Sequence, residues 1–227
     1  MNAYSELFRN KPMVLIMSLP VNDATICRAA FEAGADAVKV HINLHHNAGG
    51  ETLGDYYYNR QTFETMLAEA RGPMGIVPGA SAPAIMKDAE KVKQSGFDFI
   101  SFYTKHMPVS ALPFRQEFMA ACDKDYTTGE IESCERMGAS VIEASIIPYE
   151  EYGTALNFRD VARYGAIARA TSLPVVVPTQ RFIAPGDVRF LHAAGVRGIM
   201  IGAVVTGKTL EGISSAVKYF REAIDNL

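Results

Sequence analysis

Lys39 is the most unusual placement of a charged residue in this sequence, because it lies within the apolar run AVKVHI at 37–42. An ammonium group inside a strand is costly to desolvate unless it is paired with an acid or shifted toward its neutral form. A desolvated lysine can act as an acid, as a base or as a nucleophile that forms a Schiff base. The alternative is a structural ion pair between Lys39 and Glu143.

Three further residues could take part in proton transfer. His41 is two residues after Lys39, so both side chains lie on one face of the same strand, and imidazole changes its charge near neutral pH. Asp123 and Glu143 belong to neighbouring strands and could form an acid and base pair. The structural alternative for His41 is a hydrogen bond to a backbone carbonyl. For the two acids it is a salt bridge to Lys39 or Lys124. The catalytic candidates are Lys39, His41, Asp123 and Glu143.

A glycine-rich turn after the apolar run 198–201 is the second chemical feature. Gly202, Ala203 and Gly207 keep side chains small where backbone amides at the start of a short helix could point at an anion. Arg181 lies on the loop before this turn, and its guanidinium could form two hydrogen bonds with a phosphate or carboxylate. These residues predict a phosphate site, with an ordinary turn and a surface arginine as the alternatives.

Other ligand chemistry is weakly indicated. The histidines and acids between positions 41 and 55 have metal-ligating side chains, but their spacing matches no metal motif, so we expect no metal and no other cofactor. The three cysteines show no CxxC spacing, which favours a reducing cytoplasm. Because the net charge is −3, we do not expect nucleic acid as a partner. The sequence contains no run of 18 apolar residues, so we expect no membrane-spanning segment.

The elements that must position these residues follow from a repeating pattern. Apolar runs separated by amphipathic segments predict repeated β/α units and a parallel sheet. Several of the helices end at a glycine corner that turns the chain back into a strand. We therefore predict one (β/α)8 TIM barrel that forms a single domain over residues 1–227. The expected strands are 14–18, 37–42, 74–78, 97–102, 118–122, 140–146, 175–178 and 198–201.

An open doubly wound sheet is the rival architecture. No GxGxxG motif follows the first strand, and its absence argues against the dinucleotide-binding version of that fold. The longest connection, at 43–59, contains three tyrosines and two histidines. Because it follows the second strand, we expect it to be a mobile lid over the catalytic face or an oligomer contact. A homodimer is therefore one of the expected oligomeric states.

Four segments carry a resemblance to a known family: FMAACDK, RMGASVIEASIIPYEEYGT, QRFIAPGDV and GIMIGAVVTG. Together they resemble the ribulose-phosphate-binding barrel superfamily, and most of all its N-acetylmannosamine-6-phosphate 2-epimerases. The resemblance covers roughly the second half of the chain. It implies a barrel that binds a phosphorylated sugar, with Arg181, Gly202 and Ala203 as phosphate ligands.

The chain departs from those epimerases at both proton-handling positions. They have a lysine after the third strand, where this chain has VPGAS, and a glutamate two residues before the arginine, where it has Thr179. Lys39 and Glu143 would then have to supply the proton transfer.

The function favoured by the sequence is a cytoplasmic enzyme of carbohydrate metabolism. It would be an isomerase or epimerase that binds a phosphorylated small molecule and moves a proton next to a carbonyl. Two alternatives remain: an aldolase-type lyase in which Lys39 forms a Schiff base, and a non-catalytic protein that binds phosphorylated metabolites.

Overall fold

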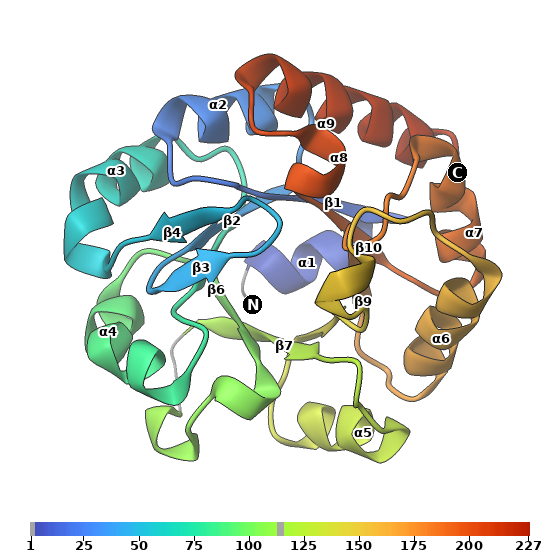
Figure 1. The fold of residues 1–227 in the computed structure, drawn as a ribbon, viewed down its shortest axis with the longest axis horizontal. Helices are drawn as coiled ribbons and strands as arrows, with labels where there is room; N and C mark the ends of the chain where they lie inside the picture. The colour runs from blue at the N-terminus through green and yellow to red at the C-terminus, as the bar shows by residue number, and fades with distance from the viewer. Residues whose placement is uncertain (1–2, 113–115) are drawn as a thin grey trace.

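The computed structural model describes residues 3–112 and 116–227. Within them, eight parallel strands close into a barrel with helices around the outside, as Figure 1 shows. The pairing of the last strand with the first completes the closure. The predicted (β/α)8 TIM barrel is thereby confirmed. The barrel strands are β1 (Val14–Ser18), β2 (Ala37–His41), β5 (Met74–Val77), β6 (Phe99–Tyr103), β7 (Glu117–Cys122), β8 (Val141–Ala144), β9 (Val175–Pro178) and β10 (Gly198–Ile201).

Every expected strand is present, and β1, β9 and β10 have the predicted bounds. The fourth begins two residues later than predicted, because Asp98 accepts a hydrogen bond from the Met74 amide and forms part of the turn into the strand. The sixth ends at Ala144 instead of continuing to residue 146, because the Ser145 amide donates to the Glu143 carbonyl and turns the chain locally.

Helices that follow the strands cover the outside of the barrel. Side chains cap two of these helices: the Asp23 side chain accepts from the Ile26 amide, and Thr127 forms a capping box with Glu130. Pro185 opens a 3₁₀ turn, Pro185–Asp187, ahead of the next helix. The main outer helices are α2 (Ala24–Glu32), α3 (Tyr56–Glu69), α4 (Ala82–Gln94), α5 (Thr128–Arg136), α6 (Phe158–Arg169), α7 (Val188–Ala193) and α9 (Leu210–Asp225).

The barrel interior is apolar in its lower half, near the amino ends of the strands, and more polar in its upper half, near their carboxyl ends. Side chains alternate along each strand, so every second residue points inward. The lower half forms one cluster of buried side chains, including Ile16, Phe99, Met119, Val141 and Val176. Two residues further along three of these strands, the inward positions are the polar residues Ser18, Ser101 and Glu143, and this change creates the site at the carboxyl end.

The amino end of the barrel is closed by the helix α1 (Ala3–Asn10). The Tyr4 ring is fully buried and stacks on Phe99 with ring centroids 3.8 Å apart. Gly75 makes room for this stack, because a Cβ there would lie 2.2 Å from the Phe99 ring. The opposite, carboxyl end of the barrel is the face turned toward the viewer in Figure 1.

The connection 43–59 is ordered into two elements. Strands β3 (Leu44–His46) and β4 (Glu51–Leu53) form an antiparallel hairpin that lies across the carboxyl end of the barrel (Figure 1). The three tyrosines begin α3, and Asp55 caps that helix by accepting from the Tyr58 amide. No helix in the described ranges has the length and apolarity needed to cross a bilayer.

Candidate functional site

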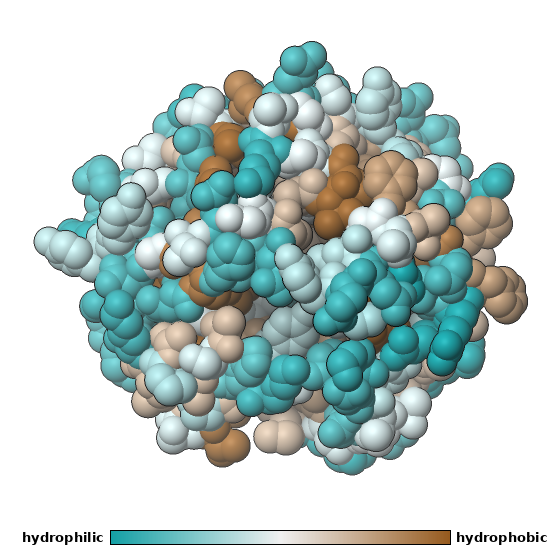
Figure 2. All heavy atoms as spheres, in the orientation of Figure 1, coloured by the Kyte–Doolittle hydropathy of each residue, from teal (hydrophilic) through white to brown (hydrophobic). Residues whose placement is uncertain are grey.

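A cavity of about 260 Å³ opens at the carboxyl end of the barrel. The surrounding surface is largely hydrophilic, with scattered apolar side chains (Figure 2). The cavity is lined by inward-facing strand residues, by the loops that follow them and by the hairpin 44–53. Its polar lining side chains are Ser18, Lys39, His41, His45, His46, Asn47, Ser101, Tyr103, His106, Glu143, Ser145, Tyr152, Thr179 and Gln180.

A buried ion pair lies in the wall of this cavity. Lys39 Nζ donates to Glu143 Oε2 at 3.0 Å, and both side chains are less than a tenth exposed. The two residues belong to β2 and β8, which lie opposite each other in the barrel. The structural alternative considered from the sequence, an ion pair between these residues, is therefore present, and it stands inside the cavity that a ligand would enter.

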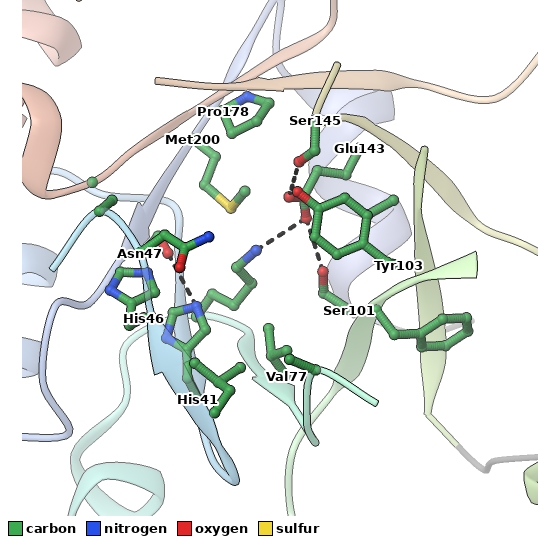
Figure 3. Close-up of a pocket in the computed structure, with 18 of the residues that line it drawn as sticks. His41, His46, Asn47, Val77, Ser101, Tyr103, Glu143, Ser145, Pro178 and Met200 are labelled. Atoms are coloured by element: carbon green, nitrogen blue, oxygen red, sulfur yellow. Dashed lines mark hydrogen bonds and ion pairs between the residues drawn. The ribbon is translucent and has the colours of Figure 1, made fainter. Parts of the chain in front are cut away.

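Glu143 also accepts hydrogen bonds from two serine hydroxyls. Ser101 Oγ lies 2.8 Å from Oε2, and Ser145 Oγ lies 2.7 Å from Oε1 (Figure 3). Burial acts to raise the pKa of Glu143, but the charge of Lys39 and the three hydrogen bonds outweigh it, so this pKa is lowered. Glu143 is therefore an ionised carboxylate with most of its acceptor sites filled.

Two tyrosine hydroxyls extend this network. Tyr103 interacts with Ser145 and with Tyr152, and burial raises the Tyr103 pKa. Gln180 Nε2 donates to the Tyr152 hydroxyl at 2.7 Å, while Gln180 Oε1 accepts from the Ile147 amide at 3.1 Å. The network therefore reaches from the carboxylate of Glu143 to the loop after β9.

His41 and His46 form the opposite wall. Their rings lie 4.3 Å apart between centroids, and His41 Nε2 is 3.4 Å from Ser18 Oγ. Burial, together with the neighbouring cations, lowers the pKa of both, that of His46 to about 4. Both imidazoles are thus neutral at pH 7. A neutral imidazole offers the site a hydrogen-bonding group without a charge.

The predicted phosphate corner is only partly assembled around the cavity. Gly202 lines it, and its amide donates to Thr179 Oγ1 at 3.0 Å. Ala203 is the first residue of the short helix α8 (Ala203–Thr206), in which the Val205 and Thr206 amides both donate to the Gly202 carbonyl. Gly207 ends that helix with a φ of 63°, a conformation that favours glycine, and it lies outside the cavity lining.

Arg181 faces away from this corner. Its guanidinium donates to Asp160 Oδ2 at 2.8 Å and also pairs with Glu151. The side chain is only 8% exposed, and it lines a second, polar cleft beside the N-terminus of α6. The arginine predicted from the sequence to hold phosphate is therefore occupied by two carboxylates and is not in the main cavity.

Asp123 is also separated from the network. Its carboxylate pairs with Lys105 at 2.6 Å on the rim of the barrel, and it does not line the cavity. The predicted pairing of Asp123 with Glu143 is not seen. Asp123 follows the last residue of β7, and its carboxylate is bonded to Lys105 instead. Of the four catalytic candidates, the structure brings together Lys39, His41 and Glu143.

Several cavity residues were not among the catalytic or phosphate-binding candidates of the sequence interpretation. Ser101 and Tyr103 lie on β6 in the inward row of Phe99, so the alternation of that strand contained the signal. Tyr152 and Gln180 come from loops, where no periodicity exists to place a side chain. In the described part of the chain, no group of three His, Cys, Asp or Glu side chains is arranged to hold a metal ion.

Comparisons with known proteins show the fold. No family model and no curated protein matches the sequence. Among solved structures, a thiamine phosphate pyrophosphorylase from Pyrococcus furiosus is 17% identical with a TM-score of 0.62, and the match covers 96% of this chain and 98% of that one. A tryptophan synthase from M. tuberculosis is 12% identical with a TM-score of 0.72, over 99% of each chain. The chain thus shares the TIM-barrel fold with these enzymes.

Proposed function

We propose that this protein is an enzyme that moves a proton next to the carbonyl of a small phosphorylated metabolite, as an isomerase or epimerase does. The observation that carries this proposal is the Lys39–Glu143 pair at 3.0 Å inside the cavity. Protons on carbon next to a carbonyl are abstracted when a base is close and a cation stabilises the developing oxyanion. Glu143 is the base in this proposal, and the ammonium group of Lys39 binds the oxygen.

The phosphate of the substrate is assigned to the turn after β10. Gly202 lines the cavity, and the first amides of α8 follow it. In TIM barrels the loops after the seventh and eighth strands are a frequent phosphate site. One structure with the same fold is a thiamine phosphate pyrophosphorylase, whose name also specifies a phosphorylated molecule. Arg181 has no part in this assignment, because Asp160 and Glu151 hold it elsewhere.

A Schiff-base lyase is the second candidate, because the Lys39 amine lies in the cavity where a carbonyl would bind. The ion pair argues for the first candidate: a Schiff base needs a neutral amine, and an ionised Glu143 stabilises the ammonium form. A non-catalytic binding protein is the third, and it would use the cavity without proton transfer.

Binding is tested first by thermal shift with a panel of phosphorylated metabolites, each beside its unphosphorylated form. A ligand at a hundredfold its Kd adds about 2.7 kcal/mol of stability. Each metabolite that binds is then incubated with the enzyme in D2O, and NMR follows deuterium at the carbon next to the carbonyl. Exchange that depends on Glu143 supports the proposal. Covalent trapping on Lys39 by borohydride would establish the lyase, and binding without either reaction would establish the binding protein.

A further inference from the structure

Several hydrogen-bond donors near Glu143 are already used inside the protein. Ser101 and Ser145 donate to the two oxygens of the Glu143 carboxylate. Gln180 Nε2 donates to the Tyr152 hydroxyl at 2.7 Å. A donor that already has an acceptor offers little to a ligand, because the existing hydrogen bond must be broken first. The donors that could bind a substrate oxygen must therefore be sought elsewhere in the cavity wall.

Lys39 has donors that the protein does not use. An ammonium group carries three N–H donors. One of them meets Glu143 Oε2 at 3.0 Å, and Nζ has no second acceptor among the described residues. The Lys39 side chain lines the cavity and is only 5% exposed. Because buried donors are normally paired, a ligand oxygen in the cavity would be the acceptor for the other N–H groups.

Asn47, in the turn of the hairpin 44–53, is a second group with unused donors. It lines the same cavity as Lys39, it is exposed, and it makes no hydrogen bond to any described residue. Figure 3 shows the Asn47 side chain pointing into the cavity beside His46. An asparagine amide offers two N–H donors and carries no charge. Asn47 can therefore donate to a ligand oxygen that Lys39 also binds.

The turn that carries Asn47 is ordered without a ligand. The Gly50 amide closes it by donating to the His46 carbonyl at 2.7 Å. Gly49 lies so close to the loop after β1 that a Cβ at this position would be 3.1 Å from the Pro20 carbonyl oxygen. The turn is thus packed against the barrel, and the Asn47 amide is positioned before a substrate arrives, as electrostatic catalysis requires.

We propose that Asn47 is a catalytic residue, whose side-chain amide joins Lys39 in binding the substrate oxygen that becomes negatively charged. This assignment rests on the proton-transfer function proposed above. Two donors aimed at one oxygen stabilise the enolate more than the carbonyl compound, because the charge develops only during the reaction. A neutral amide suits this place: a second cation would be repelled by the ammonium group, and a carboxylate would compete with the substrate for it.

The proposed step is balanced in protons and electrons. Glu143 takes the proton from carbon, the electron pair of that C–H bond forms the C=C bond, and the carbonyl pair moves to oxygen. Lys39 and Asn47 donate hydrogen bonds to this oxygen and keep their own protons. Return of the proton from Glu143 to carbon restores the carbonyl. When the carboxyl proton has first exchanged with D2O, this return places deuterium on that carbon.

The first experiment compares two ligands that share a phosphate group. We choose 2-phosphoglycolate, whose planar carboxylate resembles an enediolate, and ethyl phosphate, which has a methyl group in place of that carboxylate. Asn47→Leu should raise the Kd of 2-phosphoglycolate about tenfold in calorimetry, as expected for the loss of a hydrogen bond to a charged group. It should leave the Kd of ethyl phosphate, measured by NMR titration, unchanged.

The outcomes separate the assignment from the function on which it rests. An unchanged Kd for 2-phosphoglycolate in Asn47→Leu, or an equal loss with both ligands, would overturn the assignment. A wild-type protein that does not bind 2-phosphoglycolate would overturn the proposed function itself. The control is Thr52→Val, on the same hairpin but outside the cavity lining, which should bind as the wild type does. An equal loss in Thr52→Val would show an effect of the hairpin and not of the amide.

A second experiment observes the Asn47 amide directly. Binding of 2-phosphoglycolate should shift its side-chain 1H–15N signals, which are assigned by their loss in Asn47→Leu, and ethyl phosphate should leave them in place. Asn47→Asp keeps the shape but puts an anionic oxygen where the NH2 group was, so it should bind 2-phosphoglycolate more weakly than Asn47→Leu. Signals that do not move, or an Asn47→Asp variant with wild-type affinity, would show that this amide does not donate to the ligand.

Discussion

Lys39 and Glu143 stand on strands four positions apart in either direction around the barrel, and their side chains meet inside it with Nζ 3.0 Å from Oε2. Neither charge has enough contact with water to be stable alone. Each charge therefore depends on the other, and both depend on closure of the barrel. Substitutions at this pair should therefore change stability as well as function.

Removal of one partner should be more harmful than removal of both. We expect Lys39→Met to lower the free energy of unfolding by about 3–5 kcal/mol, because it leaves the buried carboxylate unpaired. Lys39→Met combined with Glu143→Leu should recover part of that loss, since no uncompensated charge remains. Urea denaturation of the three proteins measures both effects. A double variant less stable than either single variant would contradict this account. Each of these variants should abolish proton exchange.

Arg181 should affect stability far more than ligand affinity. Arg181→Met leaves Asp160 buried without its partner and should destabilise the fold by about 3–5 kcal/mol. Calorimetry on the folded variant should give a Kd for 2-phosphoglycolate within about twofold of the wild type, because Arg181 does not line the main cavity. A Kd raised tenfold or more would restore this residue as a phosphate ligand.

The stability of the protein should fall at acidic pH because His46 is buried as a neutral imidazole. Burial holds the pKa of His46 at about 4, below its value of 6.5 in the unfolded chain, so the unfolded state binds the extra proton first. Stability is therefore complete above pH 6.5 and is lost as the pH falls toward 4, by at most about 3 kcal/mol at 1.36 kcal/mol per pKa unit. Urea midpoints between pH 4 and 7 should show a smaller loss in His46→Gln. His45→Gln, at an exposed position, is the matched control.

The hairpin 44–53 should respond to ligand. It lines the cavity with His46 and Asn47, and an ion pair of 3.0 Å joins Glu51 to Lys208, which follows α8. Bound 2-phosphoglycolate should slow hydrogen exchange of the hairpin amides, and Lys208→Ala should raise their exchange in the free protein with little change in global stability. Equal exchange with and without ligand would show that the hairpin is not a lid.

Gly75 should not tolerate a side chain. Gly75→Ala places a Cβ 2.2 Å from the Phe99 ring, against which Tyr4 stacks, and should cost about 1–3 kcal/mol. Gly129→Ala in α5 is the contrast, because nothing lies within 4 Å of a Cβ there and alanine is the better helix former. Thermal unfolding of both variants checks the prediction, which fails if they shift the melting temperature equally.

The sequence by itself determined the barrel, because the period of apolar runs is a local property that each strand and helix carries in its own residues. It also identified Lys39 and Glu143, since a charge within an apolar strand can be read without knowing its neighbours. The alternation along β6 contained Ser101 and Tyr103, although the sequence interpretation did not include them among its catalytic candidates.

The tertiary structure alone decided which groups meet. Arg181 and Asp123 follow barrel strands as expected, yet one bonds to α6 and the other to a lysine on the rim. Tyr152 and Gln180 reach the network from loops, whose course depends on packing against the whole barrel. Side-chain direction at the end of a strand is set by contacts between segments far apart in the chain, and no local pattern records them.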